Sequence, residues 1–391
     1  MKTTGNIFIG VAGVGTMGAG IAQAIAAAGH QVFLYDEHPN ARERAKNTIN
    51  SSLKRLIDKG IISADEAFDI FDRTRFVDSI SEFRNCDFII EAIVEDLKAK
   101  QDLFEELEHF VSDETILATN TSSLSVTEIS SLCKKPGRVI GAHFFNPAPL
   151  MPLVEIVRGL LTSEQSVRTA KELIDGWNKT TVVCKDSPGF IVNRVSLPYY
   201  GEALRILEEQ IADVQTIDWA MKKIGKFRMG PFETMDLIGN DVNYKVNEEI
   251  FQQFKYDKRF KPSPIQKKLI DEGKLGRKSG EGFYVYPHTD NEVINKDENI
   301  SIEIFFRILS VLINEAAAVV YSKVATVHDI DLAMLKGFKY SKGPLKWADE
   351  IGIDKVVRRL NLLYEKSGEE RYRVNPLLKS MAMENKKFYA D

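Results

Sequence analysis

The chain has 391 residues, of which 44% are hydrophobic and 28% are charged, and its formal net charge is −4. This length is enough for two or three domains, and the slightly acidic globular composition disfavours a nucleic-acid or anionic-membrane partner. Cys86, Cys133 and Cys184 belong to no CxxC or His/Cys cluster, so we expect no metal, no disulfide framework and a reducing, cytoplasmic setting.

The first 185 residues alternate strand-like and helix-like segments. The predicted strands include NIFIGVAG, QVFLYD, CDFIIEAI and TILATN, and the predicted helices include MGAGIAQAIAAAG, residues 40–59 and LKAKQDLFEELEHFV. Alternation of this kind indicates a parallel sheet wrapped by helices. We therefore predict an α/β Rossmann-type domain over residues 1–185. We expect no secretory leader before the first strand and no uninterrupted apolar span long enough for a bilayer.

Helical periodicity replaces the strands after TTVVCKD, which ends at residue 186. Ser187 is predicted to cap the first of these helices, with Pro188 as its first residue. The polar, aperiodic segment PHTDNEVINKDEN, residues 287–299, separates this region from a second helical region. We therefore predict two tandem all-α domains, residues 186–286 and 298–391, after the Rossmann-type domain.

The two helical regions are copies of one sequence. A shift of 113 residues aligns IDWAMKKIGKFRMGPFETMDLIGND (217–241) with IDLAMLKGFKYSKGPLKWADEIGID (330–354), with twelve identities in twenty-five positions and no gap. This match indicates an internal duplication. The same shift places Phe306 at the position of Asn193, so the second copy cannot perform any polar function of Asn193.

Gly13, Gly15 and Gly18 form a GxGxxG motif between a predicted strand and an Ala-rich helix, and Asp36 ends the next strand. In a dinucleotide-binding unit such glycines allow a tight turn, the approach of backbone to pyrophosphate and close helix packing. The acid would accept hydrogen bonds from the adenosine ribose and repel a 2′-phosphate, so the pattern predicts NAD. The alternative is a glycine-rich turn that only packs a helix.

Two strand-like runs, RVIGAHFF and PLVEIVRG, flank a segment with prolines at positions 147, 149 and 152. A hairpin about this stiff segment would place His143 beside Glu155. Two interpretations stay open at this point. The pair is either a general base with its orienting carboxylate or an ordinary buried histidine whose N–H is satisfied.

NTSSL, residues 120–124, follows a predicted strand at the carboxyl edge of the sheet, where ligands bind in doubly wound folds. By itself it also fits a polar turn that leads to a helix capped by Ser125, with Glu128 three residues on. Asn193, behind PGF, by itself also fits a solvated or locally bonded side chain.

Together these segments resemble the 3-hydroxyacyl-CoA dehydrogenase family. The resemblance runs in order through EAIVEDLKAK, NTSSL, HFFNPAPLMPLVEIV, DSPGFIVNR, MGPFETMDLIG and GRKSGEGFYVY, and it covers residues 5–286. It implies NAD-dependent, reversible oxidation of an (S)-3-hydroxyacyl-CoA to the 3-oxoacyl-CoA, as in fatty-acid β-oxidation. The implied substrate is therefore an acyl-CoA.

The resemblance implies four catalytic residues, which are Ser122, His143, Glu155 and Asn193. His143 would take the hydroxyl proton while the carbon-bound hydride leaves for the nicotinamide. Glu155 would orient the imidazole and stabilise the imidazolium that forms. Ser122 and Asn193 would hydrogen-bond the substrate oxygens and align the reacting carbon.

The resemblance also implies residues that contact the cofactor, namely Glu95, Lys100, Asn120, Asn146 and Lys278. It places CoA contacts on Ser52 and Lys59, which are seven residues apart and share one helical face. The helix around them matches the family mainly in its charged character. Solvated surface side chains therefore remain the alternative for these two residues.

Two rival functions stay open. One is a dehydrogenase of a free 3-hydroxy acid such as gulonate, or of carnitine, which would use the same four groups without a basic CoA-binding helix. The other is a catalytically silent, crystallin-like dinucleotide-binding protein, which the intact Ser–His–Glu–Asn set disfavours. The second helical copy is predicted to pack on the first within the chain as a pseudo-dimer, with one active site per chain. Whether whole chains also form a homodimer stays open.

Overall fold

The computed structural model describes residues 7–287 and 297–389. The chain divides into two compact units, residues 1–187 and 188–391, and each is described by itself. The division falls close to the boundary predicted near residue 186. Most of the predicted linker, residues 287–299, lies outside the described residues. The further division of the second unit into domains of residues 186–286 and 298–391 stays a prediction.

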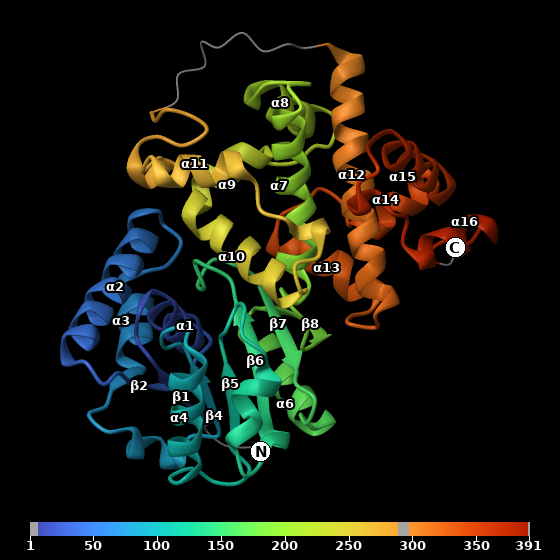
Figure 1. Ribbon diagram of the computed structural model, residues 1–391. Helices are drawn as coiled ribbons and strands as arrows, with labels where there is room; N and C mark the ends of the chain where they lie inside the picture. The colour runs from blue at the N-terminus through green and yellow to red at the C-terminus, as the bar shows by residue number, and fades with distance from the viewer. Residues whose placement is uncertain (1–6, 288–296, 390–391) are drawn as a thin grey trace. The chain divides into compact units, whose positions relative to one another are not determined.

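The first unit is built on one eight-stranded sheet with the order β3-β2-β1-β4-β5-β6-β7-β8 (Figure 1). All neighbouring strands are parallel except β6 and β7, which are antiparallel. The strands are β1 (Phe8–Ala12), β2 (Gln31–Tyr35), β3 (Thr74–Phe76), β4 (Phe88–Glu91), β5 (Ile116–Thr119), β6 (Val139–Phe144), β7 (Leu153–Arg158) and β8 (Thr180–Lys185).

Within residues 7–187, six α-helices accompany the sheet: α1 (Thr16–Ala27), α2 (Pro39–Asp58), α3 (Ala64–Asp72), α4 (Leu97–Glu108), α5 (Val126–Ile129) and α6 (Glu164–Asp175). One apolar core joins α1, α2 and α6 to the strand residues Ile9, Phe88 and Ile140. Strand side chains alternate between faces, so these helices cover the face to which those three residues point. The predicted Rossmann-type α/β architecture is confirmed.

The second unit contains two sets of helices in the same order. The first set is α7 (Val192–Glu208), α8 (Val214–Lys223), α9 (Pro231–Ile238), α10 (Asn240–Gln253) and α11 (Pro264–Asp271). The second set is α12 (Glu298–Tyr321), α13 (Val327–Gly337), α14 (Pro344–Ile351), α15 (Ile353–Ser367) and α16 (Pro376–Met383). When 113 is added to the first residue numbers of α8, α9 and α10, the results are the first residue numbers of α13, α14 and α15.

The two copies also share buried turns. Asp218 accepts hydrogen bonds from the backbone N–H groups that open α9, and Asp331 accepts from those that open α14, at 2.9 Å each. A Cβ on Gly230 or on Gly343 would come within 2.2 Å of the carboxyl group below it. The GP sequence that both copies keep is therefore required by the close approach of backbone to a buried aspartate.

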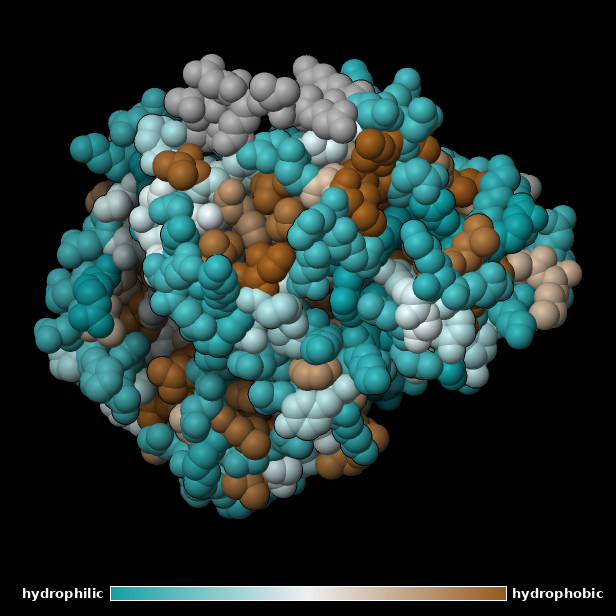
Figure 2. Space-filling view, turned by 45° about the horizontal axis from the view of Figure 1, so that its top comes forward, coloured by the Kyte–Doolittle hydropathy of each residue, from teal (hydrophilic) through white to brown (hydrophobic). Residues whose placement is uncertain are grey.

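Helix α7 packs along α12, so the two copies meet within this unit (Figure 1). By length and composition α12 could cross a membrane, although charged residues such as Arg307 and Glu315 interrupt its apolar sequence. However, 83% of its most apolar window is buried in the helical unit. Packing therefore accounts for its apolar character. Hydrophilic residues cover most of the face seen in Figure 2, and the hydrophobic ones form separate patches.

The start of the first helix differs from the prediction. Helix α7 begins at Val192, after Ile191, and not at Pro188 behind a Ser187 cap. Gly189 and Phe190 have φ angles of +72° and +49°, so the chain turns through the left-handed region before the helix. A Cβ on Gly189 would lie 2.6 Å from Ile250, which fits only glycine at this turn.

Candidate active site

The glycine loop has the geometry expected of a phosphate-binding turn. Gly13 has φ +90°, and a Cβ there would lie 2.6 Å from the carbonyl oxygen of Ala92. A Cβ on Gly18 would lie 1.9 Å from the carbonyl oxygen of Gly13, so helix and loop touch. Open space surrounds Gly15, the N-cap of α1, and the first turn of that helix carries no acidic side chain. The N–H groups and the helix dipole at this end suit a pyrophosphate.

Asp36 lies beside this loop. Its two carboxylate oxygens accept hydrogen bonds from the backbone N–H groups of Val14 and His38, each at 3.0 Å. Gly13 also donates to the carbonyl of Tyr35 at 2.8 Å, so β2 fixes the loop at two points. A carboxylate has about four acceptor sites, and those not used here are available to ribose hydroxyls.

His143 and Glu155 are direct partners across the antiparallel β6–β7 pair. His143 Nδ1 lies 2.7 Å from Glu155 Oε2. The glutamate is fully buried and the histidine is 6% exposed. A carboxylate only accepts hydrogen bonds, so the ring nitrogen that faces it, Nδ1, carries the hydrogen and donates it. In the neutral ring this leaves Nε2 as the nitrogen that can accept a proton. The hairpin prediction is therefore confirmed, and the geometry suits an oriented base.

Asn120 connects the ends of three strands. Its N–H donates to the carbonyl of Glu91 at the end of β4, and its Oδ1 accepts from the N–H of Phe144 at the end of β6, both at 2.9 Å. These bonds fix the carboxyl edge of the sheet next to His143. In this structure the side-chain oxygen of Asn120 thus supports the site from within the protein.

Glu95 holds the loop that carries Ser122. Its Oε1 accepts from the hydroxyl of Thr121 at 2.5 Å and from the N–H of Ser122 at 3.1 Å. Burial alone would raise the pKa of Glu95, but the Lys100 ammonium and these hydrogen bonds outweigh it and lower the pKa. The Ser122 hydroxyl makes no hydrogen bond to any residue in the described ranges. It is therefore available for a substrate oxygen.

Lys100 is buried between two glutamates. Its Nζ lies 2.6 Å from Glu91 Oε1 and 3.2 Å from Glu95 Oε2, and the residue is only 1% exposed. This burial leaves almost no surface for a direct contact with a cofactor. In this structure the ammonium acts on the site through Glu95, whose position and charge it fixes.

Glu91 is a residue that the sequence analysis did not identify. It is fully buried at the end of β4 and accepts from Lys100, from the Thr119 hydroxyl at 2.7 Å and from the N–H of Ile93 at 2.8 Å. Burial raises the pKa of its carboxyl even though Lys100 opposes this. The signal in the sequence was an acid that ends an apolar strand, with a lysine nine residues later on the following helix.

Ser52, Lys59 and Asn146 line one pocket in the first unit, with a volume of about 380 Å³. The pocket runs between α1, α2 and the segment 146–150, and Arg55 of α2 also lines it. A Cβ on Gly20 of α1 would lie 3.2 Å from Pro149, so glycine lets this segment approach the helix. The structure thus brings together the predicted CoA contacts of α2 and one predicted cofactor contact.

The other two predicted residues belong to the second unit. Asn193 is the second residue of α7 and is half-buried. Lys278 pairs with Asp241 at 2.6 Å, and this contact helps to lower the pKa of the aspartate against the opposing effect of burial. The contacts of Asn193 and Lys278 with substrate or cofactor stay predictions.

Two models of known protein domains match the chain. The NAD-binding-domain model of 3-hydroxyacyl-CoA dehydrogenases matches residues 8–187, and the C-terminal-domain model of the same enzymes matches residues 189–286 and again residues 304–389. The chain belongs to the 3-hydroxyacyl-CoA dehydrogenase family. The predictions of this family and of NAD as the cofactor are confirmed, and the glycine loop described above fits that cofactor.

Relatives in this family match the chain over most of its length. The 3-hydroxyadipyl-CoA dehydrogenase of Escherichia coli K12 is 35% identical, with 96% of this chain and 97% of that protein covered. A probable 3-hydroxybutyryl-CoA dehydrogenase of Deinococcus radiodurans is 40% identical and covers 71% of this chain and 99% of its own length. The crystal structure of a 3-hydroxybutyryl-CoA dehydrogenase from E. coli K12 has a TM-score of 0.91 at 34% identity, over 97% of this chain and 99% of that chain.

Proposed function

We propose that the protein catalyses the reversible, NAD-dependent oxidation of an (S)-3-hydroxyacyl-CoA to the corresponding 3-oxoacyl-CoA. The buried His143–Glu155 pair at the carboxyl end of β6 is the observation that carries this proposal. A histidine oriented by a carboxylate, on the same carboxyl edge of the sheet as a dinucleotide-binding loop, is the minimum that alcohol oxidation needs from the protein.

His143 takes the proton of the substrate hydroxyl on Nε2, because Nδ1 is directed at Glu155. Glu155 stabilises the imidazolium that results, and in the reverse direction the imidazolium returns the proton to the carbonyl oxygen. The pair is buried against β6, β7 and β8, which keeps the ring orientation fixed throughout the reaction.

Ser122 and Asn193 position the substrate oxygens. The Ser122 backbone is held by Glu95, so its hydroxyl is presented from a loop that cannot shift without breaking that bond. The hydrogen bond from each of these side chains becomes stronger as negative charge develops on the substrate oxygen. The bound NAD supplies a hydride acceptor at the nicotinamide. The glycine loop and Asp36 hold its adenosine and pyrophosphate, and Glu95, Asn146 and Lys278 are assigned to its nicotinamide half.

Ser52 and Lys59 bind the CoA moiety in the pocket between α1 and α2. A half-buried serine and two exposed cations, Arg55 and Lys59, line this pocket together with apolar side chains, and this combination suits a phosphate-bearing thioester better than a free hydroxy acid. This feature favours the acyl-CoA function over the gulonate or carnitine alternative. The silent, crystallin-like alternative leaves the buried His143–Glu155 pair without a function.

The two helical copies form a pseudo-dimer within one chain, with a single active site per chain in this proposal. The packing of α7 on α12 supports this arrangement. Whether whole chains also form a homodimer can be tested by sedimentation of the purified protein. We further propose a cytoplasmic location, which is supported by three cysteines that are all buried and belong to no CxxC or His/Cys cluster.

The test is NADH oxidation by the purified chain with acetoacetyl-CoA, 3-oxoadipyl-CoA, longer 3-oxoacyl-CoAs and the free 3-oxo acids as separate substrates. The first two thioesters are included because one relative bears the name 3-hydroxyadipyl-CoA dehydrogenase and others bear the name 3-hydroxybutyryl-CoA dehydrogenase. We expect turnover of a thioester and at least about tenfold less with its free acid. Equal rates with the free acid would refute the CoA assignment.

A further inference from the structure

Arg194 of α7 and Glu315 of α12 form a buried ion pair between the two copies, with 2.7 Å from Nε to Oε1. The 113-residue shift takes Arg194 to Arg307 and takes Glu202 to Glu315. Arg307 and Glu202 also pair, with 2.5 Å from Nε to Oε1. Each arginine is therefore neutralised by a carboxylate of the other copy, as at an interface between two identical subunits.

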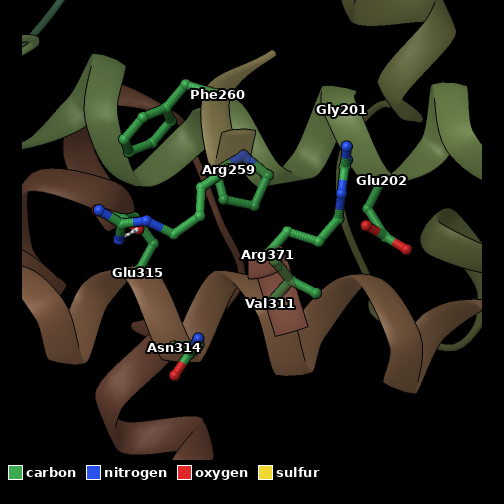
Figure 3. A pocket seen from close by; sticks show the side chains of 9 residues that line it. Gly201, Glu202, Arg259, Phe260, Val311, Asn314, Glu315 and Arg371 are labelled. Carbon is green, nitrogen blue, oxygen red and sulfur yellow. Dashed lines mark hydrogen bonds and ion pairs between the residues drawn. The ribbon is translucent and has the colours of Figure 1, made fainter. Parts of the chain in front are cut away.

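The surroundings of the two glutamates differ. Figure 3 shows Arg259 lying against Glu315, and its NH1 donates to Glu315 Oε2 at 2.8 Å. At the corresponding position of the second copy stands Tyr372, whose hydroxyl donates to Glu202 at 2.6 Å. A small cavity of about 20 Å³ between α7 and α12 separates the two glutamates, which is room for about one water.

The two arginines differ in how far they depend on these partners. Arg307 also binds Glu209, at 2.8 Å from NH1 to Oε2. Arg194 has Glu315 as its single carboxylate partner within residues 7–287 and 297–389, and it is 4% exposed. Loss of Glu315 would thus leave the buried guanidinium of Arg194 without its directly paired carboxylate, which is a costly state.

The first turn of α7 lacks one of the backbone hydrogen bonds that would join it to the rest of that helix. Pro198 lies inside α7 and has no N–H to donate to the carbonyl of Arg194, four residues earlier. The left-handed turn at Gly189 and Phe190 precedes this first turn on its other side. In α12 the position of Pro198 is taken by Val311, so the second copy has no such break.

We infer that Glu315 is a positioning residue for Asn193, an inference that rests on the proposed contact of Asn193 with the substrate. Consecutive helix residues are separated by about 100° around the axis, so anchoring Arg194 on α12 fixes the direction in which Asn193 points. The copy that has lost the asparagine thus supplies the carboxylate that orients the asparagine of the other copy.

The test compares Glu315→Gln with its matched control Glu202→Gln, in the full-length chain with NADH and the best 3-oxoacyl-CoA. Both substitutions remove one buried carboxylate from the same interface, but only Glu315 lies on the pair next to Asn193. We expect Glu315→Gln to lower kcat at least about tenfold, with KM for NADH unchanged, and Glu202→Gln to change kcat less than about twofold. Equal losses of kcat in the two variants would overturn the inference.

A second measurement separates positioning from general loss of structure. In an Asn193→Ala background the site has no asparagine to orient, so adding Glu315→Gln should change kcat less than about twofold. A further tenfold loss in the double variant would contradict action through Asn193. If Glu315→Gln is insoluble, Arg194→Lys and its control Arg307→Lys replace the pair, with the same expected contrast. A wild-type chain inactive on every thioester would refute the proposed function, and the inference with it.

Discussion

His143 and Glu155 face each other across the only antiparallel strand pair in the described part of the sheet, with Nδ1 and Oε2 2.7 Å apart. The reversal of direction at β6–β7 is what brings two residues twelve positions apart into register. The catalytic assignment depends on this contact, and the first two predictions test it.

His143→Gln should lower kcat by at least about 10²-fold, because the reaction loses its positioned base. NADH binding should change little, since the glycine loop lies on other strands. Steady-state kinetics with a thioester and NADH titration followed by fluorescence check both parts. Full activity in the variant would remove His143 from the mechanism.

Glu155→Gln should reduce turnover and also change its pH dependence. A neutral amide no longer favours the protonated imidazole, so the acidic limb of the pH–rate profile for alcohol oxidation should move to lower pH. The profile is measured from about pH 5 to pH 9 for both proteins. A limb that does not move would show that the carboxylate has no electrostatic effect on the base.

Lys59→Ala should raise KM for the acyl-CoA, more at low than at high ionic strength, because a partly exposed lysine–phosphate contact is screened by salt. Lys54→Ala is the matched control, since Lys54 is exposed on the same helix α2 and does not line the pocket. The same KM in both variants at low salt would place Lys59 among the solvated surface charges.

Asp36→Ala should raise activity with NADPH relative to NADH, because the carboxylate that repels a 2′-phosphate is removed. The loop also loses the bond from the N–H of Val14, so some loss of NADH affinity should accompany the change. The ratio of kcat/KM for the two cofactors is the measurement. A wild-type chain that uses both cofactors equally would contradict this role of Asp36.

Lys100→Met should destabilise the first unit by about 3–5 kcal/mol, the usual cost of removing one partner of a buried pair. Glu91 would then be buried beside no ammonium, which raises its pKa in the folded state still further. A folded-state pKa above the unfolded value stabilises at low pH, and that stability is lost as the pH rises. The melting temperature of the variant should therefore fall further below that of wild type at pH 8 than at pH 5. Lys98→Met, which breaks an exposed pair on the same helix, should leave the melting temperature nearly unchanged at both pH values.

The fold and the β6–β7 hairpin can be predicted from the sequence because the patterns that indicate them are local. The period of the strands, the glycine spacing and the proline-rich turn all act within about twenty residues, and Ser125 caps α5 as predicted. Helix α3 and strand β3 were missed, although Ser63 and Glu66 form a complete capping box there. Their apolar pattern is short, nine and three residues, and gives a weak signal next to the long charged helix α2.

The site was predicted less completely than the fold because its supporting residues act over long distances in the sequence. The acid at the end of β4 and the lysine nine residues later are visible in the sequence, but only the folded chain shows that the two are buried together. The start of α7 was misplaced because Ser-Pro is a common helix opening, whereas the close approach of Ile250 forces a turn at Gly189 instead. Contacts of this kind are set by packing, which a single sequence does not display.

The pairing of α7 with α12 inside one polypeptide has a consequence for how the protein responds to dilution and to evolutionary change. Its two halves cannot dissociate, so the contact persists at nanomolar concentrations where a two-chain assembly of modest affinity would separate. In a homodimer every substitution at the interface occurs in both subunits, and both copies of the interface must tolerate it. In this chain a substitution changes only one of the two helical copies. The differences between Pro198 and Val311 and between Arg259 and Tyr372 are such independent changes.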